Sequence, residues 1–437
     1  MGDEDGMADL KKITRAELNE ILALHQGALT NQRGGRLANL EFHDLANEEL
    51  SDIDLSRADF TGASLQHAML AKTIFTQATL FCADLRVANL RRANMTRSNL
   101  RGACMRGADL SDAIMVDADM REGVLAWHDG TASQFEHRKA EISAAIAARA
   151  DFTGAKMAGS FVAQTDFTDS VMRNANLSGA DMRNCVFVGA QLDGADLSGA
   201  TMAGADLRSA DLSGANIEKA DFEGAELTGA IVDPEALSAP ELSAAIKPSP
   251  NAEKGEQLDE ILAAHRQWAN SEGGARADLS NADLSDRDMR EINLAAAVLT
   301  TAVLRGSDLS HGVLSMADLS GADMRASNLQ GADMRGVKLE RATLNGAILT
   351  GADLSPLKNT GPSSRVWRSS LAHARFRNAD LSEAKLTEAD LRGASLDDAN
   401  LSGADLSGAD VTDASFRGAN LTDAKLDGTD MRLANLD

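Results

Sequence analysis

Large apolar residues recur at every fifth position over most of the chain. They fill four phased runs of Leu, Met, Phe, Ile or Val over residues 40–125, 152–232, 279–354 and 376–436, which together comprise 64 pentads. The residue two places earlier is usually small, and in the last run it is Ala in 12 of 13 pentads. A period of five matches neither the 3.6-residue helical turn nor the two-residue alternation of a strand, so the chain must turn a corner in every pentad. We therefore expect the small and the large residue to point inward and the other three to face solvent.

The breaks between the runs collect residues that do not suit a stacked coil. All six Pro and all three Trp lie outside the runs, because Pro lacks a backbone donor and an indole is too large for a core of Leu and Ala. Two breaks are predicted to be inserts. Residues 126–151 contain Trp127 and Phe135 and are predicted to form an amphipathic helix near 136–149. Residues 355–375 are basic and contain no acid before the next run.

Two similar segments indicate a tandem duplication. Residues 17–25 read ELNEILALH and residues 257–265 read QLDEILAAH, at a uniform offset of 240. Both have helical apolar spacing and lead through a pair of Gly residues into the first pentads. The predicted layout is a tail and capping helix at 1–39, a first solenoid at 40–232, a linker with helices at 233–276 and a second solenoid at 277–437. Helices at these points would cover open coil edges, and a short helix near 236–246 would close the first solenoid.

The repeated sequence resembles that of the pentapeptide-repeat family. Ala195–Gly199 and Ala404–Gly408 both read ADLSG, and in-phase pentads cover roughly three quarters of the chain. The resemblance implies an all-β solenoid, namely a right-handed quadrilateral β-helix with four pentads per coil. It further implies about 16 coils in two tandem blocks, with short α-helical caps and inserts.

Composition and charge limit the partners of such a rod. The 437 residues include 12 Phe and no Tyr, which suits a thin core. The 43 Lys and Arg stand against 66 Asp and Glu, and the formal charge of -23 disfavours direct contact with nucleic acid or an anionic membrane. The chain has no stretch of 18 apolar residues, and Cys82, Cys104 and Cys185 lack disulfide or zinc spacing. These features predict a soluble, cytoplasmic protein.

No arrangement of residues in the sequence predicts an enzyme. We find no nucleophile with a His partner, no Gly-rich phosphate loop and no metal-ligand spacing, so no catalytic residue, cofactor or metal is predicted. His25 and His265 correspond across the duplication, which could indicate a ligand pair. Their shared place in a helix favours packing of that helix on the first coil.

Two groups of residues are candidates for binding a protein partner. The first comprises outward positions in the second coil of each solenoid that are apolar, which indicates either a side interface or drift of a tolerant surface position. They are Met69, Ile74, Val298, Val303 and Val313. The second lies in the basic insert, which is either a binding loop or a tether that folds back on the rod. It comprises Lys358, Arg365, Trp367 and Arg368.

The C-terminal coil is a candidate for self-association. The pentads are still in register at Met431, Leu433 and Leu436, so the final coil is expected to end without a cap. We expect this end to dock on another copy and to give a homo-oligomer. C-terminal pairing into a dimer also occurs in gyrase-binding members of the family that the sequence resembles.

Two functions are compatible with these features. The first is a non-enzymatic interaction scaffold, an acidic rod that presents patches and inserts to protein partners. The alternative, implied by the resemblance, is a DNA mimic that inhibits or protects DNA gyrase or a related type II topoisomerase through Asp390, Asp410 and Asp430, which recur once in every four pentads. Spread over about 77 Å of rod, the net charge has roughly half the linear density of duplex DNA. A basic band interrupts it, comprising Arg86, Arg91, Arg101 and Arg106.

Overall fold

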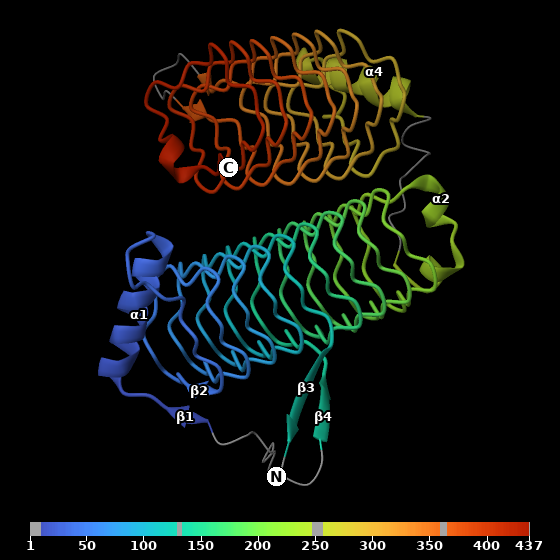
Figure 1. The fold of residues 1–437 in the computed structure, drawn as a ribbon. Coiled ribbons are helices and arrows are strands. Elements are labelled where there is room, and N and C mark those ends of the chain that lie inside the picture. Colours follow the sequence, from blue (N-terminus) through green and yellow to red (C-terminus); the bar gives the residue numbers. More distant parts are fainter. Residues whose placement is uncertain (1–9, 129–132, 247–256, 359–364, 437) are drawn as a thin grey trace. The chain divides into compact units, whose positions relative to one another are not determined.

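The computed structural model describes residues 10–128, 133–246, 257–358 and 365–436. The chain divides into two compact units, Met1–Pro248 and Ser249–Asp437. Each unit is a stack of coils (Figure 1). Each has its own continuous apolar core. They are called the first and the second unit.

Parallel backbone pairing between residues four pentads apart builds both units. Asn39 pairs with Asp59, and the same interval recurs along the first unit and, from Asp278 onwards, along the second. The N–H of Leu40 donates to the Asp59 carbonyl at 2.7 Å, and the N–H of Asp59 donates to the Ala38 carbonyl at 3.0 Å. One turn therefore contains four pentads, and each turn is joined to the next by a ladder of hydrogen bonds, as in a β-helix.

The inward rows are those that the five-residue period predicts. The large residue of nearly every pentad and the Ala two places before it are buried in both units. Phe residues fill the core at a few levels. The ring of Phe167 lies 5.6 Å from that of Phe152, edge to face, and 5.1 Å from that of Phe187, stacked. Burial of these apolar rows is the main stabilising term of each rod.

The corners explain the preference for Gly two places after each large residue. Gly199 has a φ of 63°, and Asp398, at the equivalent place, has a φ of 56°. This left-handed conformation carries a steric cost for residues with a Cβ, least for Asn and Asp. A corner in every pentad therefore favours Gly, Asn and Asp, although other residues such as Arg57 and Val87 also adopt this conformation.

An α-helix covers the start of each unit. Helix α1 (Arg15–Leu29) begins with a capping box formed by Thr14 and Glu17, and its Leu18 is fully buried against the first coil. A short parallel pair, β1 (Lys11–Lys12) with β2 (His43–Asp44), continues the ladder beside it. Helix α4 (Leu258–Ala269) takes the corresponding place in the second unit, with Leu258 buried.

The predicted helix near 136–149 is wrong, because the first insert is a β-hairpin. Strands β3 (Gly123–His128) and β4 (Ser133–Arg138) pair in antiparallel register, from Gly123 opposite Arg138 to His128 opposite Ser133. The hairpin projects from the side of the first unit (Figure 1). The last inward residue before it is Met120, and Leu125, predicted as an inward centre, lies in β3.

The coils resume earlier than predicted after the hairpin. Cys104 pairs with Glu141, whereas the regular interval would pair it with Val124, so the insert lengthens this one coil and ends before Ala140. Ile142 and Ala147 are buried centres of further pentads. Because Ala replaces the large residue at 147, the five-residue pattern is hidden there, and the remaining apolar residues of 136–149 imitate helical spacing.

The second insert is also shorter than predicted. It begins with β5 (Leu357–Lys358), which pairs in antiparallel register with β6 (Val366–Trp367). Lys338 pairs with Ser370, whereas the regular interval would pair it with Lys358, so this insert also lengthens a single coil. The repeat resumes at Leu371, which is fully buried, and the bounds 355–375 were too wide because Ser369 takes the place of the usual Ala.

The two units end differently. In the first, α2 (Pro234–Leu237) and a 3₁₀ helix, η1 (Pro240–Leu242), stand where one helix near 236–246 was predicted, and Leu242 is buried on the core. In the second, a 3₁₀ helix, η2 (Met431–Leu433), interrupts the last coil. The regular interval nevertheless returns after this turn, where Asn435 pairs with Ser415, so the predicted register is kept there, while Leu436 is half exposed.

No helix within the described ranges has the length and apolar character that a membrane span requires.

Candidate interaction surfaces

A carboxylate and an arginine of the same pentad form a recurring ion pair on the outside of both units. In Asp390-Leu391-Arg392, Nε of Arg392 donates to Asp390 Oδ1 at 2.8 Å and Nη2 donates to Oδ2 at 2.6 Å. Asp and Arg flank the inward residue, so both project from the same face. This bidentate bond from Arg392 holds the pKa of Asp390 below its ordinary value.

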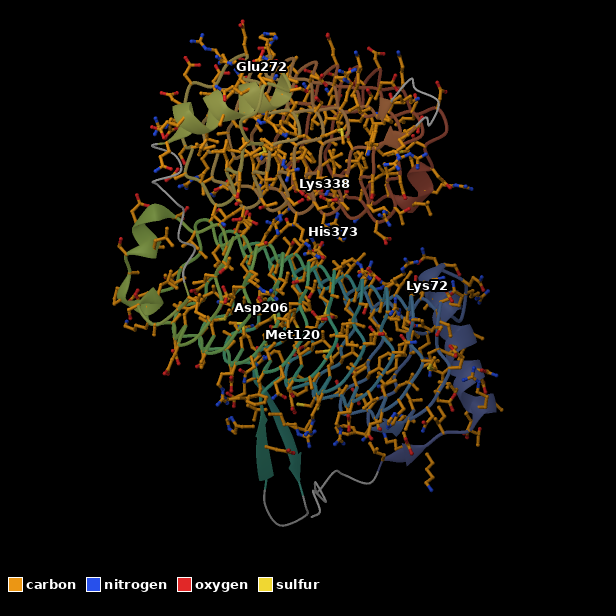
Figure 2. The ribbon with its side chains drawn as sticks, turned by 180° about the vertical axis from the view of Figure 1, so that it is seen from behind. Lys72, Met120, Asp206, Glu272, Lys338 and His373 are labelled. Atoms are coloured by element: carbon orange, nitrogen blue, oxygen red, sulfur yellow. The ribbon has the colours of Figure 1, made fainter. Side chains whose placement is uncertain are left out.

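All nine Asp-Leu-Arg or Asp-Met-Arg triplets of the sequence form this pair. They begin at Asp84, Asp119, Asp181, Asp206 (labelled in Figure 2), Asp288, Asp323, Asp333, Asp390 and Asp430. Where Ser or Thr takes the place of Arg, its backbone N–H and hydroxyl donate to the carboxylate instead, as Thr412 does to Asp410. The residue after the centre therefore decides whether the carboxylate has an arginine partner in its own pentad, and neighbouring coils supply further cations, as Lys338 does to Asp318 at 3.3 Å.

The three aspartates of the predicted DNA-mimicking face do not form one acidic column. Asp390 pairs with Asp410 across adjacent coils. Asp430 lies at the N-terminus of η2 and accepts a hydrogen bond from the N–H of Arg432 at 3.2 Å. Asp390 and Asp430 are both held by an arginine of their own pentad. The triplet sequence was the signal that could have revealed this neutralisation.

Basic residues of the second insert form ion pairs on this face, which neutralise part of the positive charge of the insert. Nζ of Lys358 and Nη2 of Arg368 lie 3.8 and 3.3 Å from the carboxylate of Glu388. Arg368, Glu388, Asp390 and Asp410 line one surface hollow of about 270 Å³. The structure thus brings together two sets of candidate residues that the sequence did not connect.

The other described residues of this insert differ in their exposure to solvent. Trp367 is half-buried, and a Cβ on Gly336 of the coil would lie 3.3 Å from the Trp367 Cβ. This contact agrees with a tether that folds back on the rod. Arg365 and Val366 are exposed, and residues 359–364 lie outside the described residues.

Small residues and ion pairs fix the base of the β3–β4 hairpin. A Cβ on Gly123 would lie 2.8 Å from the Arg101 carbonyl, so only glycine allows this approach. Nε of Arg101 donates to the Glu122 carbonyl at 3.0 Å, and the Glu122 carboxylate lies 2.6 Å from Nδ1 of His137. Arg138 adds an ion pair to Glu136 at 2.7 Å. The hairpin therefore leaves the rod in a defined direction.

The predicted basic band lies next to this base and is largely neutralised. Arg86 is held by Asp84, which is buried, and Arg106 lies 3.4 Å from Glu141. Arg91 pairs with Asp109 at 3.3 Å. A hollow of about 180 Å³ at this point is lined by Asp84, Arg86, Cys104, Arg106, Glu136, Arg138, Lys139 and Glu141, among others.

The apolar outward residues form no shared side interface. Met69 and Ile74 are 42% and 37% exposed, whereas Val298, Val303 and Val313 are half-buried. The coil ladders start at Asn39 and Asp278, an offset of 239. By this offset Ile74 corresponds to Val313 and Met69 corresponds to Asp308. Only one position is thus apolar in both units.

His25 and His265 join each helix to its first coil in the same way. Both side chains are buried. Nδ1 of His25 accepts a hydrogen bond from the N–H of Ala38 at 3.0 Å, and Nδ1 of His265 accepts one from the N–H of Ala277 at 3.1 Å. The His265 ring also stacks on Trp268, with ring centres 5.3 Å apart. This geometry agrees with the packing interpretation and requires a neutral imidazole.

We expect these two histidines to make the protein sensitive to mild acid. Burial lowers the pKa of both, so below about pH 6.5 the unfolded chain binds protons that the folded chain excludes. Stability is therefore full above that pH and falls as the pH drops toward 5. In the double variant His25→Asn, His265→Asn, the amide oxygen can replace Nδ1 as acceptor without titrating, so the urea midpoint should change much less between pH 7.5 and 5. An equal change in both proteins would contradict this role.

Sequence comparison decides the family. Models of pentapeptide repeats match in eight copies, over residues 38–80, 78–117, 150–189, 190–229, 277–315, 317–355, 367–398 and 399–437. These segments cover well over half of the chain. The chain belongs to the pentapeptide-repeat family. Its fold is the right-handed β-helix solenoid of that family, as the sequence predicts.

Several solved pentapeptide-repeat proteins are similar in structure. HetL, involved in heterocyst differentiation regulation in the cyanobacterium Nostoc, is 22% identical over 77% of this chain and 97% of its own, with a TM-score of 0.21. Rfr23 of the cyanobacterium Cyanothece is 20% identical over 30% of this chain and 91% of its own, with a TM-score of 0.19. QnrB1, a plasmid-mediated fluoroquinolone resistance protein, is 16% identical over 63% of this chain and 78% of its own, with a TM-score of 0.17. A search of curated proteins gave no match.

The cysteines of this pentapeptide-repeat protein are poor nucleophiles. Cys82 and Cys185 are buried, and burial raises the pKa of Cys82 and Cys104 to about 11 and that of Cys185 to about 12. Among the described residues, no three His, Cys, Asp or Glu side chains are placed to hold a metal ion.

Proposed function

We propose that this pentapeptide-repeat protein is a non-enzymatic scaffold that holds the β3–β4 hairpin out to a protein partner. The observation that carries the proposal is the fixed base of the hairpin, where Gly123 packs against the Arg101 carbonyl and Glu122 is bound from two sides. A projecting element on a rigid support is suited to binding because little ordering remains to be done at contact. About 16 coils with helices at their starting ends would supply that support.

Affinity capture with a matched pair of variants tests the scaffold proposal. In one variant a short Gly-Ser linker replaces residues 123–138, and in the control Val366→Ser changes an exposed residue of the other insert. We expect a protein captured by the full chain and by the control to be lost with the hairpin. Capture of the same proteins by all three would contradict the proposal.

We further propose that the last coil of the second unit mediates self-association. Leu421 and Leu426 are only half-buried, and among the described residues no backbone acceptor faces their N–H groups. Leu433 and Leu436, later in the same coil, are each 50% exposed. An open edge with apolar residues at its rim favours contact with a second copy.

Charge at this rim should prevent the assembly. The double variant Leu433→Asp, Leu436→Asp is expected to be monomeric, because two carboxylates per copy would be desolvated and would repel each other in the contact. Light scattering measures the mass, and Val366→Asp, equally exposed in the second insert, is the control that should leave it unchanged. A mass that is the same in all three proteins would rule out this interface.

Inhibition or protection of a type II topoisomerase is the second candidate. It is supported by carboxylates that have no arginine in their own pentad, such as Asp410, whose pentad carries Thr412 and whose Oδ2 lies 3.8 Å from Nε of Arg392 in the adjacent coil. Inhibition of gyrase supercoiling at two salt concentrations separates the two functions. A DNA mimic should inhibit supercoiling, and this inhibition should weaken steeply as the salt concentration rises. A scaffold should have no effect on supercoiling.

A further inference from the structure

The hairpin of the first unit has unpaired strand edges. β3 and β4 form a sheet of two strands with six registered pairs, and no third strand joins them in the described part of the chain. In an antiparallel pair, half of the backbone N–H and C=O groups point away from the neighbouring strand. A two-stranded hairpin alone is marginally stable in water, and a third strand is one way to stabilise it. The projecting edges are therefore suited to an extended backbone.

The two edges differ in how far they are protected. β4 carries Glu136 and Arg138, charged residues of the kind that blunt an edge strand. β3 reads GVLAWH and has no Lys, Pro, Asp or Glu. Its register with β4 is continuous over all six pairs, so it has no bulge. β3 therefore offers the open edge.

One arginine is available at the solenoid end of β3. Nε of Arg101 donates to the carbonyl of Glu122, the residue just before β3. The described residues supply no hydrogen-bond acceptor for the Nη atoms of Arg101. A guanidinium with free Nη donors recognises a carboxylate.

We propose that the outer edge of β3 binds an extended segment of another protein as a third strand, with an acidic side chain of that segment at Arg101. The inference rests on the proposed scaffold function and specifies how the hairpin binds. Backbone pairing requires an extended partner, and its side chains alternate between the two faces of the enlarged sheet. A second copy of this chain fits less well, because each copy carries a net charge of -23 and its own β3 has no carboxylate to reach Arg101.

A peptide selection supplies the probe. Twelve-residue peptides displayed on phage are selected against the full chain, and those that also bind the variant with a linker in place of residues 123–138 are discarded. We expect the remaining peptides to alternate apolar and polar residues, to lack Pro in the paired stretch and to carry Asp or Glu at one end. A selection that leaves no hairpin-dependent peptide would overturn the proposal.

Hydrogen exchange of the full chain then shows which edge is used. A saturating peptide should slow exchange of alternate amides in Gly123–His128 by on the order of tenfold or more and leave the outer amides of Ser133–Arg138 unchanged. Slowing confined to β4, or to neither strand, would overturn the proposal. So would protection of β3 without peptide that disappears on dilution, because a second copy would then be the occupant.

The role of Arg101 is tested in a cycle of two changes. Arg101→Gln is expected to lower the affinity for an acidic peptide by about tenfold, which is the effect of losing one hydrogen bond to a charged group. Arg101→Gln should not change the affinity for the same peptide in which the acidic residue is replaced by its amide. Arg97→Gln is the control, because Arg97 is exposed and lies 3.5 Å from Asp117. Equal losses with both peptides would overturn the assignment of Arg101, and a hairpin-dependent partner found by affinity capture would still leave the scaffold function in place.

Discussion

Replacing Phe167 with alanine is expected to lower the free energy of unfolding of the first unit by about 3–5 kcal/mol. The side chain is fully buried, and its ring contacts Phe152 and Phe187 on successive levels of the core. The coils cannot move together to fill the cavity, because the hydrogen-bond ladder fixes their spacing. Urea unfolding followed by circular dichroism gives the loss, and hydrogen exchange assigns it to the first unit.

Phe222→Ala is the matched control for the aromatic contacts. Phe222 is also buried in the first unit, and no aromatic pair involving it is found among the described residues. Phe222→Ala should lower the free energy of unfolding less than Phe167→Ala does, by about 1–3 kcal/mol, which is the contribution of two ring contacts. Equal losses, or a loss below about 1 kcal/mol for Phe167→Ala, would show that the Phe cluster does not determine the local stability.

The substitution Gly274→Ala is expected to detach helix α4 from its coil. A Cβ at this position would lie 2.1 Å from the Ala264 carbonyl, and the φ of 69° adds backbone strain. Neither the helix nor the chain that leads into the coil can move without losing the hydrogen bond from Ala277 to His265. We expect a loss of about 3 kcal/mol and rapid hydrogen exchange in Leu258–Ala269.

The neighbouring glycine supplies the control. Gly273 has a φ of 101°, but a Cβ there would meet nothing within 4 Å. Gly273→Ala should therefore show the cost of backbone strain alone, about 1–2 kcal/mol, with the helix still protected from exchange. If the two alanine variants behave alike, close packing at Gly274 is not what holds the helix.

The sequence predicts the repeat because its signal is redundant. Each inward residue is one of a long phased series, so the burial of Leu40 or Leu406 follows from the period alone. Where one pentad departs from the pattern the prediction fails. Ala147 hides two pentads of the first unit, and Ser369 hides the return of the chain after the second insert. At the C-terminus the period persists in the sequence, but Met431–Leu433 form a 3₁₀ turn before the regular pairing returns at Asn435.

The candidate surfaces are harder to predict because they depend on neighbours in other coils. Asp390 and Arg368 were assigned to separate sites, and the structure places both at one hollow. The neutralisation of Asp390 by Arg392 is local, and could have been recognised from their places on either side of an inward Leu. The hairpin was harder to predict. Apolar and polar residues do not alternate clearly enough in the short β3 segment to distinguish a strand from a helix.

The place at which each insert leaves its rod gives the repeat a second role. In the first unit the paired residues run from Asn39 to Asp119 in steps of five before the hairpin, which makes 17 pentads, and in the second from Asp278 to Asp353, which makes 16. Because four pentads close one turn, a difference of one pentad moves the exit to the adjacent corner of the coil. Adding or deleting one pentad upstream would therefore re-aim an insert by a quarter turn while leaving every inward row intact. In such a protein the number of pentads before an insert sets the direction in which the insert projects, independently of the residues that make the contact.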